Sequence, residues 1–211
     1  MRAFGYEIDE LVVDHVLLAV VPVLLGLVIA LPLGWWAHRS RGARRVLVPL
    51  SGALYTIPSL ALIVFIPVLL ATPILSPLNV LVTLTIYAVA LLVRSVAEAL
   101  DSVSDTVTTA AVAVGYRPTG LLLGVQLPLA VPVLTAGVRV ASVTTFSMVT
   151  VGALVGVQSL GTLMTDGFQQ DYTAMVVTGI VGSIALAFVF DALWLGLGRS
   201  LTPWSRARAG V

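Results

Sequence analysis

Long apolar runs, separated by short polar stretches, dominate the chain. A bilayer core about 30 Å thick needs about 20 helical residues to cross it, and five runs approach or exceed that length. They cover residues 14–37, 46–71, 80–97, 129–155 and 173–197. The second run is interrupted by Pro58 and Pro67, which cannot donate helical hydrogen bonds. The pattern therefore predicts an all-α membrane protein with about five transmembrane helices.

The stretch before the first run is net acidic, and the run itself is longer than the apolar part of a cleaved signal. We therefore expect that the first run is not a cleaved signal. Residues 1–13 are expected to form an extracytoplasmic segment, on the side that the arginine distribution below assigns to them. Residues 14–198 are expected to form one transmembrane domain, with a coupling loop at about 99–128, and residues 199–211 a basic cytoplasmic tail.

The arginines of the connections gather on one side of the predicted membrane. With the first connection in the cytoplasm, that side also receives the third connection and the tail, whereas the other side holds only Arg2. The cytoplasmic arginines are then Arg39, Arg41, Arg44, Arg45, Arg117, Arg199, Arg206 and Arg208. Because cytoplasmic loops are enriched in basic residues, we expect the N-terminus outside and the C-terminus in the cytoplasm.

Composition agrees with a membrane protein and narrows its chemistry. Only 10% of the 211 residues are charged, against about 25% in soluble domains, and the mean hydropathy is +1.08. Cysteine is absent, which excludes disulfides, thiolate metal sites and a cysteine nucleophile. His15 and His38 lie at opposite ends of the first run, about 34 Å apart by helical rise. We therefore expect no metal site, no cofactor and no intramembrane enzyme.

The connection after the third run is unusually apolar. Its sequence "TTAAVAVGYRPTGLLLG", residues 108–124, predicts a short helix to Gly115, a turn through "GYRP", and a second short helix that ends near Gly124. Several large apolar residues would be exposed there: Val112, Val114, Leu121, Leu122 and Leu123. Such a surface requires a covering partner, so we expect a helical elbow that docks to a cytoplasmic protein.

This elbow resembles the EAA loop of ATP-binding-cassette (ABC) importer permeases. That pattern has Glu-Ala-Ala, a glycine four residues after the second alanine, and Leu-Pro beginning twelve residues after the glycine. The chain matches it at every position except the first, where Thr109 replaces the glutamate. The resemblance implies an ATPase-coupling set of Thr109, Ala110, Ala111, Gly115, Tyr116, Arg117, Leu127 and Pro128.

Further stretches between residues 31 and 194 look like the permeases of glycine betaine, choline and carnitine importers. They are "LPLGWWAHR", "YTIPSLALIVFIPVLL", "LPLAVPVLTAGVRVASV" and "VTVGALVGVQSLG". The resemblance implies a multi-pass protein of the bacterial cell membrane, paired with a second permease subunit as a homodimer or heterodimer. It also implies cytoplasmic ABC ATPase subunits and an extracytoplasmic solute-binding protein, with no nucleic-acid partner.

ATP hydrolysis is expected in a separate subunit, because the chain lacks the Gly-Lys-Ser/Thr ending of a phosphate-binding loop. An importer of another small solute, such as an amino acid, is the alternative within this class. A self-contained secondary transporter is a further alternative, although no inverted repeat is visible and few charges lie within the spans.

Arg139 and Asp191 are the notable charges within the spans. Arg139 lies about ten residues into the fourth run, roughly 15 Å from its start, and Asp191 lies in the inner third of the fifth. A charge at that depth needs a partner or a cavity. We expect a structural contact of Arg139 with Asp191 or a carbonyl, with gating or direct solute contact as alternatives. Arg94 and Glu98, one turn apart, are interpreted as an ordinary helical ion pair.

Other candidates for the translocation path or gate are Tyr55, Pro58, Phe146, Gly152 and Gly156. Tyr55 precedes a helix break at Pro58, which either borders the path or is a simple kink. Gly152 and Gly156 have small-xxx-small spacing, which indicates either close helix packing or an outer gate. An aromatic such as Phe146 suits a quaternary ammonium group.

Overall fold

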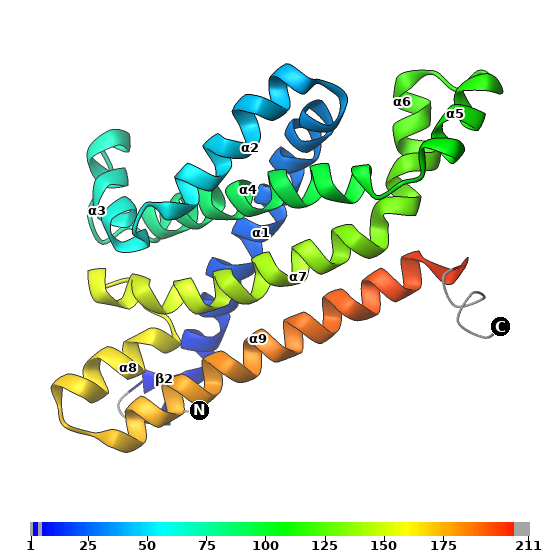
Figure 1. Cartoon of the computed structure of the whole chain (residues 1–211). Helices are drawn as coiled ribbons and strands as arrows, with labels where there is room; N and C mark the ends of the chain where they lie inside the picture. The colour runs from blue at the N-terminus through cyan, green and yellow to red at the C-terminus, as the bar shows by residue number, and fades with distance from the viewer. Residues whose placement is uncertain (1, 4–5, 205–211) are drawn as a thin grey trace.

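The chain is almost entirely helical. The computed structural model describes residues 2–3 and 6–204 (Figure 1). In this described part, four helical segments are long and apolar enough to cross a membrane: α1 (Ile8–Arg39), α4 (Pro77–Asp101), α9 (Thr173–Leu201), and Pro118–Val155, which contains α7 (Leu127–Gly152). The pair α2 (Arg41–Thr56) and α3 (Ser59–Leu70) makes a fifth candidate. The predicted architecture of about five spans is confirmed.

The helices extend beyond the apolar runs that predicted them. α1 begins at Ile8, and Asp9 and Glu10 in its first turn complement the positive end of the helix dipole. Within residues 1–13, the strands β1 (Arg2–Ala3) and β2 (Tyr6–Glu7) pair in antiparallel fashion. α9 continues to Leu201, and residues 205–211, with Arg206 and Arg208, lie outside the described part.

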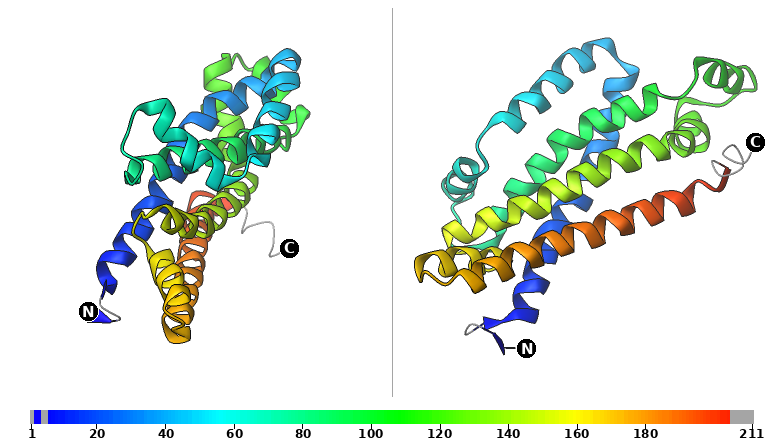
Figure 2. Two further views of the ribbon diagram at one scale, coloured as in Figure 1. Left: turned by 90° about the vertical axis from the view of Figure 1, so that its left-hand side faces the viewer. Right: turned by 60° about the horizontal axis from the view of Figure 1, so that its bottom comes forward.

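Glycine controls how closely α1 approaches α4, the most extensive helix contact of the fold. A Cβ on Gly34 would lie 2.5 Å from the Cβ of Val96, and one on Gly26 would lie 2.6 Å from that of Ala88. No larger side chain fits without movement of the helices. α1 therefore crosses α4 at very short range, and Figure 2 shows it running across the other spans.

α4, α7 and α9 lie side by side in sequence order (Figures 1 and 2). Small residues again set the spacing: Gly137 of α7 faces Ser95 of α4, and Gly198 of α9 faces Thr135 of α7. The core between α1, α4 and α7 is aliphatic, with Val23, Leu92, Val96, Ala130 and Val138 among its buried members.

α2 and α3 are bent by 102° at Ile57 and Pro58, as the proline predicts. The hydroxyl of Tyr87 on α4 donates a hydrogen bond to the Ile57 carbonyl at this break. The second predicted break, at Pro67, is wrong. Pro67 lies inside the last turns of α3, where it is buried, and the helix ends three residues later at Leu70.

The segment 156–172 contains a helix that the hydropathy pattern did not predict, α8 (Leu160–Gln169). The Ser159 side chain caps it by accepting from the Gly161 N–H, and Thr162 completes a capping box. α8 packs along α9, where Gly179 approaches the Leu160 carbonyl. Tyr6 donates a hydrogen bond to the Asp166 carboxylate, and this bond, together with burial, raises the pKa of Tyr6.

Candidate functional site

The elbow (residues 105–126) begins with α5 (Asp105–Ala113). Gly115 ends this helix in a left-handed conformation, with φ +99°. The Tyr116 N–H donates to the Ala111 carbonyl at 3.2 Å, and the Gly115 N–H to the Val112 carbonyl at 3.0 Å. These two bonds form a Schellman motif, which accounts for a glycine at this position.

The second half of the elbow is continuous with a spanning helix. Pro118 starts α6 (Pro118–Leu121) after the extended residue Arg117, as the restriction before proline favours. A π-helical turn, η1 (Leu122–Gln126), then joins α6 directly to α7. The predicted helix end near Gly124 is therefore wrong. Leu127 and Pro128 are the first residues of α7, so the elbow joins that span without an intervening loop.

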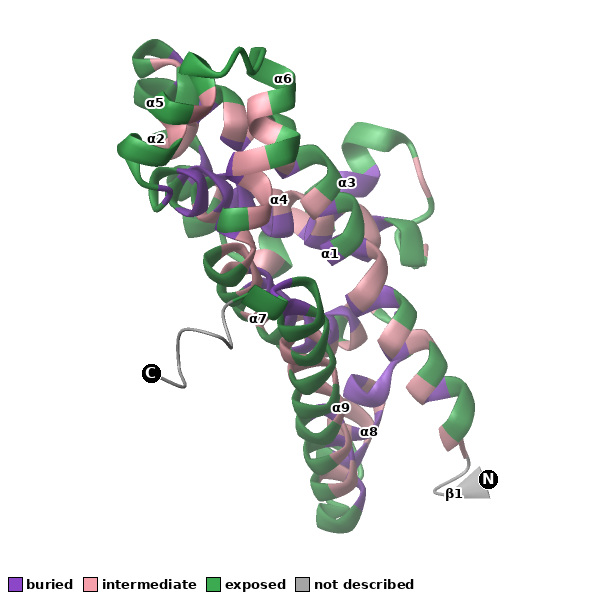
Figure 3. Ribbon diagram, turned by 90° about the vertical axis from the view of Figure 1, so that its right-hand side faces the viewer, coloured by how far each residue is buried: buried purple, intermediate pink, exposed green. Residues whose placement is uncertain are grey.

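Most of the predicted coupling residues lie at the surface (Figure 3). Neither α5 nor α6 has a buried residue, and Val114 exposes 82% of its surface. Thr109, Ala110 and Arg117 are also exposed. Leu121 and Leu122 are only half-buried, contrary to prediction, and Leu122 packs against the core. The Tyr116 ring lies over Gly124, where an added Cβ would meet it at 3.4 Å.

A polar junction cluster (His38, Arg44, Asp101 and Gln126) links the elbow to three other helices, and it was not predicted from the sequence. Asp101, the last residue of α4, accepts from Arg44 of α2 at 2.5 Å and contacts His38 of α1 at 2.6 Å. Gln126, at the end of η1, lies 3.4 Å from the second ring nitrogen of His38. α1, α2, α4 and the base of the elbow therefore meet in one hydrogen-bonded group.

The predicted contact between Arg139 and Asp191 is present. The guanidinium donates from Nε to Oδ1 at 2.7 Å and from Nη2 to Oδ2 at 2.6 Å, which joins α7 to α9 by a bidentate ion pair. Both groups stay partly exposed, with 33% and 24% of their side-chain surface accessible. Arg94 and Glu98 also form the helical ion pair expected of them, at 2.8 Å.

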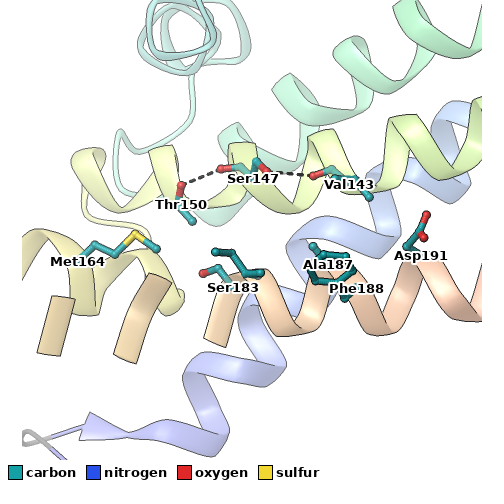
Figure 4. A pocket seen from close by; sticks show the side chains of 9 residues that line it. Val143, Ser147, Thr150, Met164, Ser183, Ala187, Phe188 and Asp191 are labelled. Carbon is teal, nitrogen blue, oxygen red and sulfur yellow. Dashed lines mark hydrogen bonds between the residues drawn. The ribbon is translucent and has the colours of Figure 1, made fainter. Parts of the chain in front are cut away.

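Two cavities adjoin the Arg139–Asp191 pair. The first, about 430 Å³, lies between α7, α8 and α9 and is lined by Ser147, Thr150, Ser183, Phe188 and Asp191, with four apolar residues (Figure 4). The second, about 420 Å³, is lined by Arg139, Thr144 and Asp191 with apolar neighbours. Asp191 and Val143 line both cavities. The pair therefore sits where two partly polar hollows meet.

The remaining path candidates do not converge on these cavities. Tyr55 is exposed near the α2–α3 break and stacks edge-on against Tyr87, with centroids 5.8 Å apart, while Pro58 precedes α3. Phe146 is fully buried between His15 and Phe190. It belongs to the core of the chain rather than to a surface that a solute reaches.

Gly152 and Gly156 do not share a helix face. Gly152 ends α7, whereas Gly156 follows the 3-10 turn η2 (Ala153–Val155) with φ +81°. The prediction that this pair packs as a small-xxx-small motif on one helix is therefore wrong. Each glycine instead meets its own neighbour, Gly152 at Val80 and Gly156 at Leu75. Their alternative role as an outer gate stays a prediction.

Among the described residues, no group of three or more His, Asp or Glu side chains is placed to hold a metal ion.

Several apolar spans, one of which is continuous with an exposed helical elbow, define a multi-pass membrane protein. The chain belongs to the family of binding-protein-dependent transport system inner membrane components, whose pattern matches residues 19–202.

Two relatives illustrate the range of this family. The chain is 31% identical over 182 residues to the glycine betaine/proline betaine transport system permease protein ProW of Escherichia coli strain K12, covering 86% of the chain but 51% of ProW. It is 26% identical over 203 residues to the choline transport system permease protein OpuBB of Bacillus subtilis strain 168, covering 96% of the chain and 92% of OpuBB. The chain thus spans about half of ProW and nearly all of OpuBB.

The fold matches a solved structure of the MetNI methionine ABC transporter in an inward-facing conformation. The TM-score is 0.82 at 23% sequence identity, and the match covers 92% of this chain and 96% of the other. At that identity the match establishes the fold alone and leaves the solute to be argued separately.

Proposed function

We propose that this chain is the membrane-spanning subunit of an ATP-driven importer for small osmoprotectants. The observation that carries the proposal is the elbow: an exposed helix–turn–helix with the EAA spacing, closed by Gly115 and continuous with α7 through a π turn. In this function the elbow is the docking surface for a cytoplasmic ABC ATPase, and the chain itself is not a catalyst.

The contacts of the elbow suggest how movement would spread. η1 leads into α7 without a break, and the junction cluster links Gln126 to α1, α2 and α4 through His38 and Asp101. When the ATPase subunits close, displacement of the elbow would tilt α7 together with these helices. Rigid movement of this kind interconverts inward-open and outward-open states of a transporter.

The orientation proposed for this function places the elbow in the cytoplasm and α8 outside. Arg39, Arg41, Arg44 and Arg45 lie at the elbow end of the bundle, whereas Asp166 and Asp171 lie at the α8 end. Positive charge favours the cytoplasmic side. The α8 end is then the face that meets a solute-binding protein, and a second permease subunit would complete the membrane domain.

The names of the relatives support the proposed solute class. Their names specify glycine betaine, proline betaine and choline, which are small quaternary ammonium compounds. By analogy we assign this chain to the same class of solutes, delivered by a binding protein.

The test is uptake of labelled glycine betaine into proteoliposomes that contain the chain, its ATPase and its binding protein. We expect uptake only when ATP and the ATPase are both present, and no loss when ionophores collapse the ion gradients. Uptake without the ATPase, abolished by ionophores, would instead identify a secondary transporter. No uptake of any quaternary ammonium compound in the complete system would contradict the proposed solute class.

A further inference from the structure

The Arg139–Asp191 pair lies where a membrane protein rarely leaves charges exposed. Arg139 is at the middle of the 26-residue helix α7, and Asp191 lies well inside α9. Both keep part of their side-chain surface accessible. Charged groups at such depth face a bundle interior or a water-filled space rather than lipid. This side of α7 and α9 therefore borders a polar space or another protein surface.

The first cavity offers oxygen atoms that act as acceptors. Ser147 donates its hydroxyl hydrogen to the Val143 carbonyl at 3.1 Å, and Ser183 donates to the Gly179 carbonyl at 2.8 Å. Their oxygen lone pairs remain available. With the Asp191 carboxylate and the ring of Phe188, which is 71% exposed, this lining suits a methylated ammonium group, which is attracted by anions and aromatic faces.

The second cavity offers donors. Arg139 uses Nε and Nη2 for Asp191, and its Nη1 makes no hydrogen bond within residues 6–204. A guanidinium carries five N–H donors in a planar fork, so donors remain for a second carboxylate. Planar recognition of carboxylates is the chemistry in which arginine exceeds lysine.

We propose that the Arg139–Asp191 pair and its two cavities form a binding site within the spans for a small zwitterion. The carboxylate of the solute binds the free edge of the Arg139 guanidinium, and its cationic head lies against Asp191 and Phe188. This site rests on the proposed function, because it requires the solute to pass this face of α7 and α9. A simple cation such as choline gains only half of these contacts and is repelled by Arg139, so the site favours zwitterions.

The experiment measures equilibrium binding of radiolabelled glycine betaine to the permease–ATPase complex in nanodiscs, without binding protein, with choline as competitor. Wild type should bind glycine betaine saturably and choline about tenfold or more weakly. Arg139→Gln should weaken glycine betaine binding about ten- to a hundredfold, the usual effect of losing a charged hydrogen-bond partner, and should reduce the preference over choline.

Phe188→Leu keeps the ion pair and most of the apolar volume, so it tests the site even where pair variants assemble poorly. It should weaken binding severalfold. Two variants are the matched controls and should bind like wild type. Phe168→Leu changes a more exposed phenylalanine outside both cavities, and Arg94→Gln breaks an exposed helical ion pair that lines neither of them.

Saturable binding that neither Arg139→Gln nor Phe188→Leu changes would overturn this site, as would absence of binding by a complex that still takes up glycine betaine. Uptake is measured in parallel on the same complex with its binding protein. If the complete wild-type complex shows no ATP-driven uptake, the proposed function itself is contradicted. Failure of the binding site alone would leave that uptake intact, so the two failures are distinguishable.

Discussion

At the scale of single residues, glycine contacts determine how the spans pack. Gly34 leaves no space for a methyl group, because Cβ and Cγ1 of Val96 and the Val93 carbonyl oxygen would all lie within 3.0 Å of it. Gly196, also inside a spanning helix, has no atom within 4 Å of an added Cβ. A glycine-to-alanine substitution should therefore affect the stability of the chain differently at the two positions.

We predict that Gly34→Ala destabilises the chain by about 1–3 kcal/mol, the usual cost of overpacking. Gly196→Ala should cause no loss or a small gain, because alanine favours helix over glycine. Thermal unfolding of the purified variants in one detergent measures both. Equal stability of Gly34→Ala and wild type would mean that α1 and α4 lie further apart than described.

The hydroxyl of Tyr87 has a defined task at the α2–α3 break, where it donates to the Ile57 carbonyl. Tyr87→Phe leaves that carbonyl without this donor, and we expect a loss of about 1–3 kcal/mol in stability. Tyr55→Phe is the matched control, since it keeps the ring contact between the two tyrosines. Thermal unfolding measures the stability of both variants. An equal loss of stability with both substitutions would contradict a special role for the Tyr87 hydroxyl.

Some of these residues could be predicted from sequence and others could not. Arg139 and Asp191 were paired correctly, because a charge inside a span leaves few options. The junction cluster was missed, since His38, Arg44 and Asp101 lie in polar connections where many pairings are possible. Phe146 looked like a candidate for solute contact, yet it is fully buried, because one sequence does not reveal which side of a largely apolar helix faces the core.

At the scale of elements, the elbow depends on the left-handed backbone of Gly115. An added Cβ at Gly115 would meet nothing within 4 Å, so a substitution acts through the backbone rather than through a clash. We predict that Gly115→Val, which places a β-branched residue at positive φ, costs about 1 kcal/mol or more locally. The expected phenotype is normal membrane abundance with weakened ATPase association and reduced uptake.

Gly115→Asn is the matched variant, because asparagine tolerates the left-handed region far better than valine. It should retain most ATPase association and uptake. Co-purification of the ATPase with each variant, alongside uptake in the same cells, provides the measurement. Full association and uptake by Gly115→Val would mean that the elbow is only a connection between spans.

Element prediction succeeded where hydropathy alone decides and failed where local geometry decides. The five apolar runs all correspond to helices, because a bilayer requires length and apolarity. α8 was missed because it is short and half polar, and its Ser159–Thr162 cap departs from the usual Ser-x-x-Glu signature. The π turn in η1 was missed because Gly124 looks like a helix end in the sequence, whereas the helix continues through it into α7.

At the scale of the whole molecule, the absence of cysteine from the sequence makes topology directly measurable. Ser159 is a poor labelling site, because it is fully buried and caps α8. Phe168→Cys, at an 83% exposed position of α8, should react with an impermeant thiol reagent added outside. Thr119→Cys, on the exposed elbow, should react only after the membrane is opened. The reverse pattern would contradict the proposed orientation.

In the proposed function, a docking surface at the elbow moves spans that receive solute at the α8 end. The most direct measurement is the ATPase rate of the reconstituted complex with solute-loaded binding protein added at the α8 side. We predict a severalfold rise in the wild-type rate and little or no rise with Gly115→Val at equal protein abundance. If solute-loaded binding protein leaves the ATPase rate of the wild-type complex unchanged, the account is contradicted.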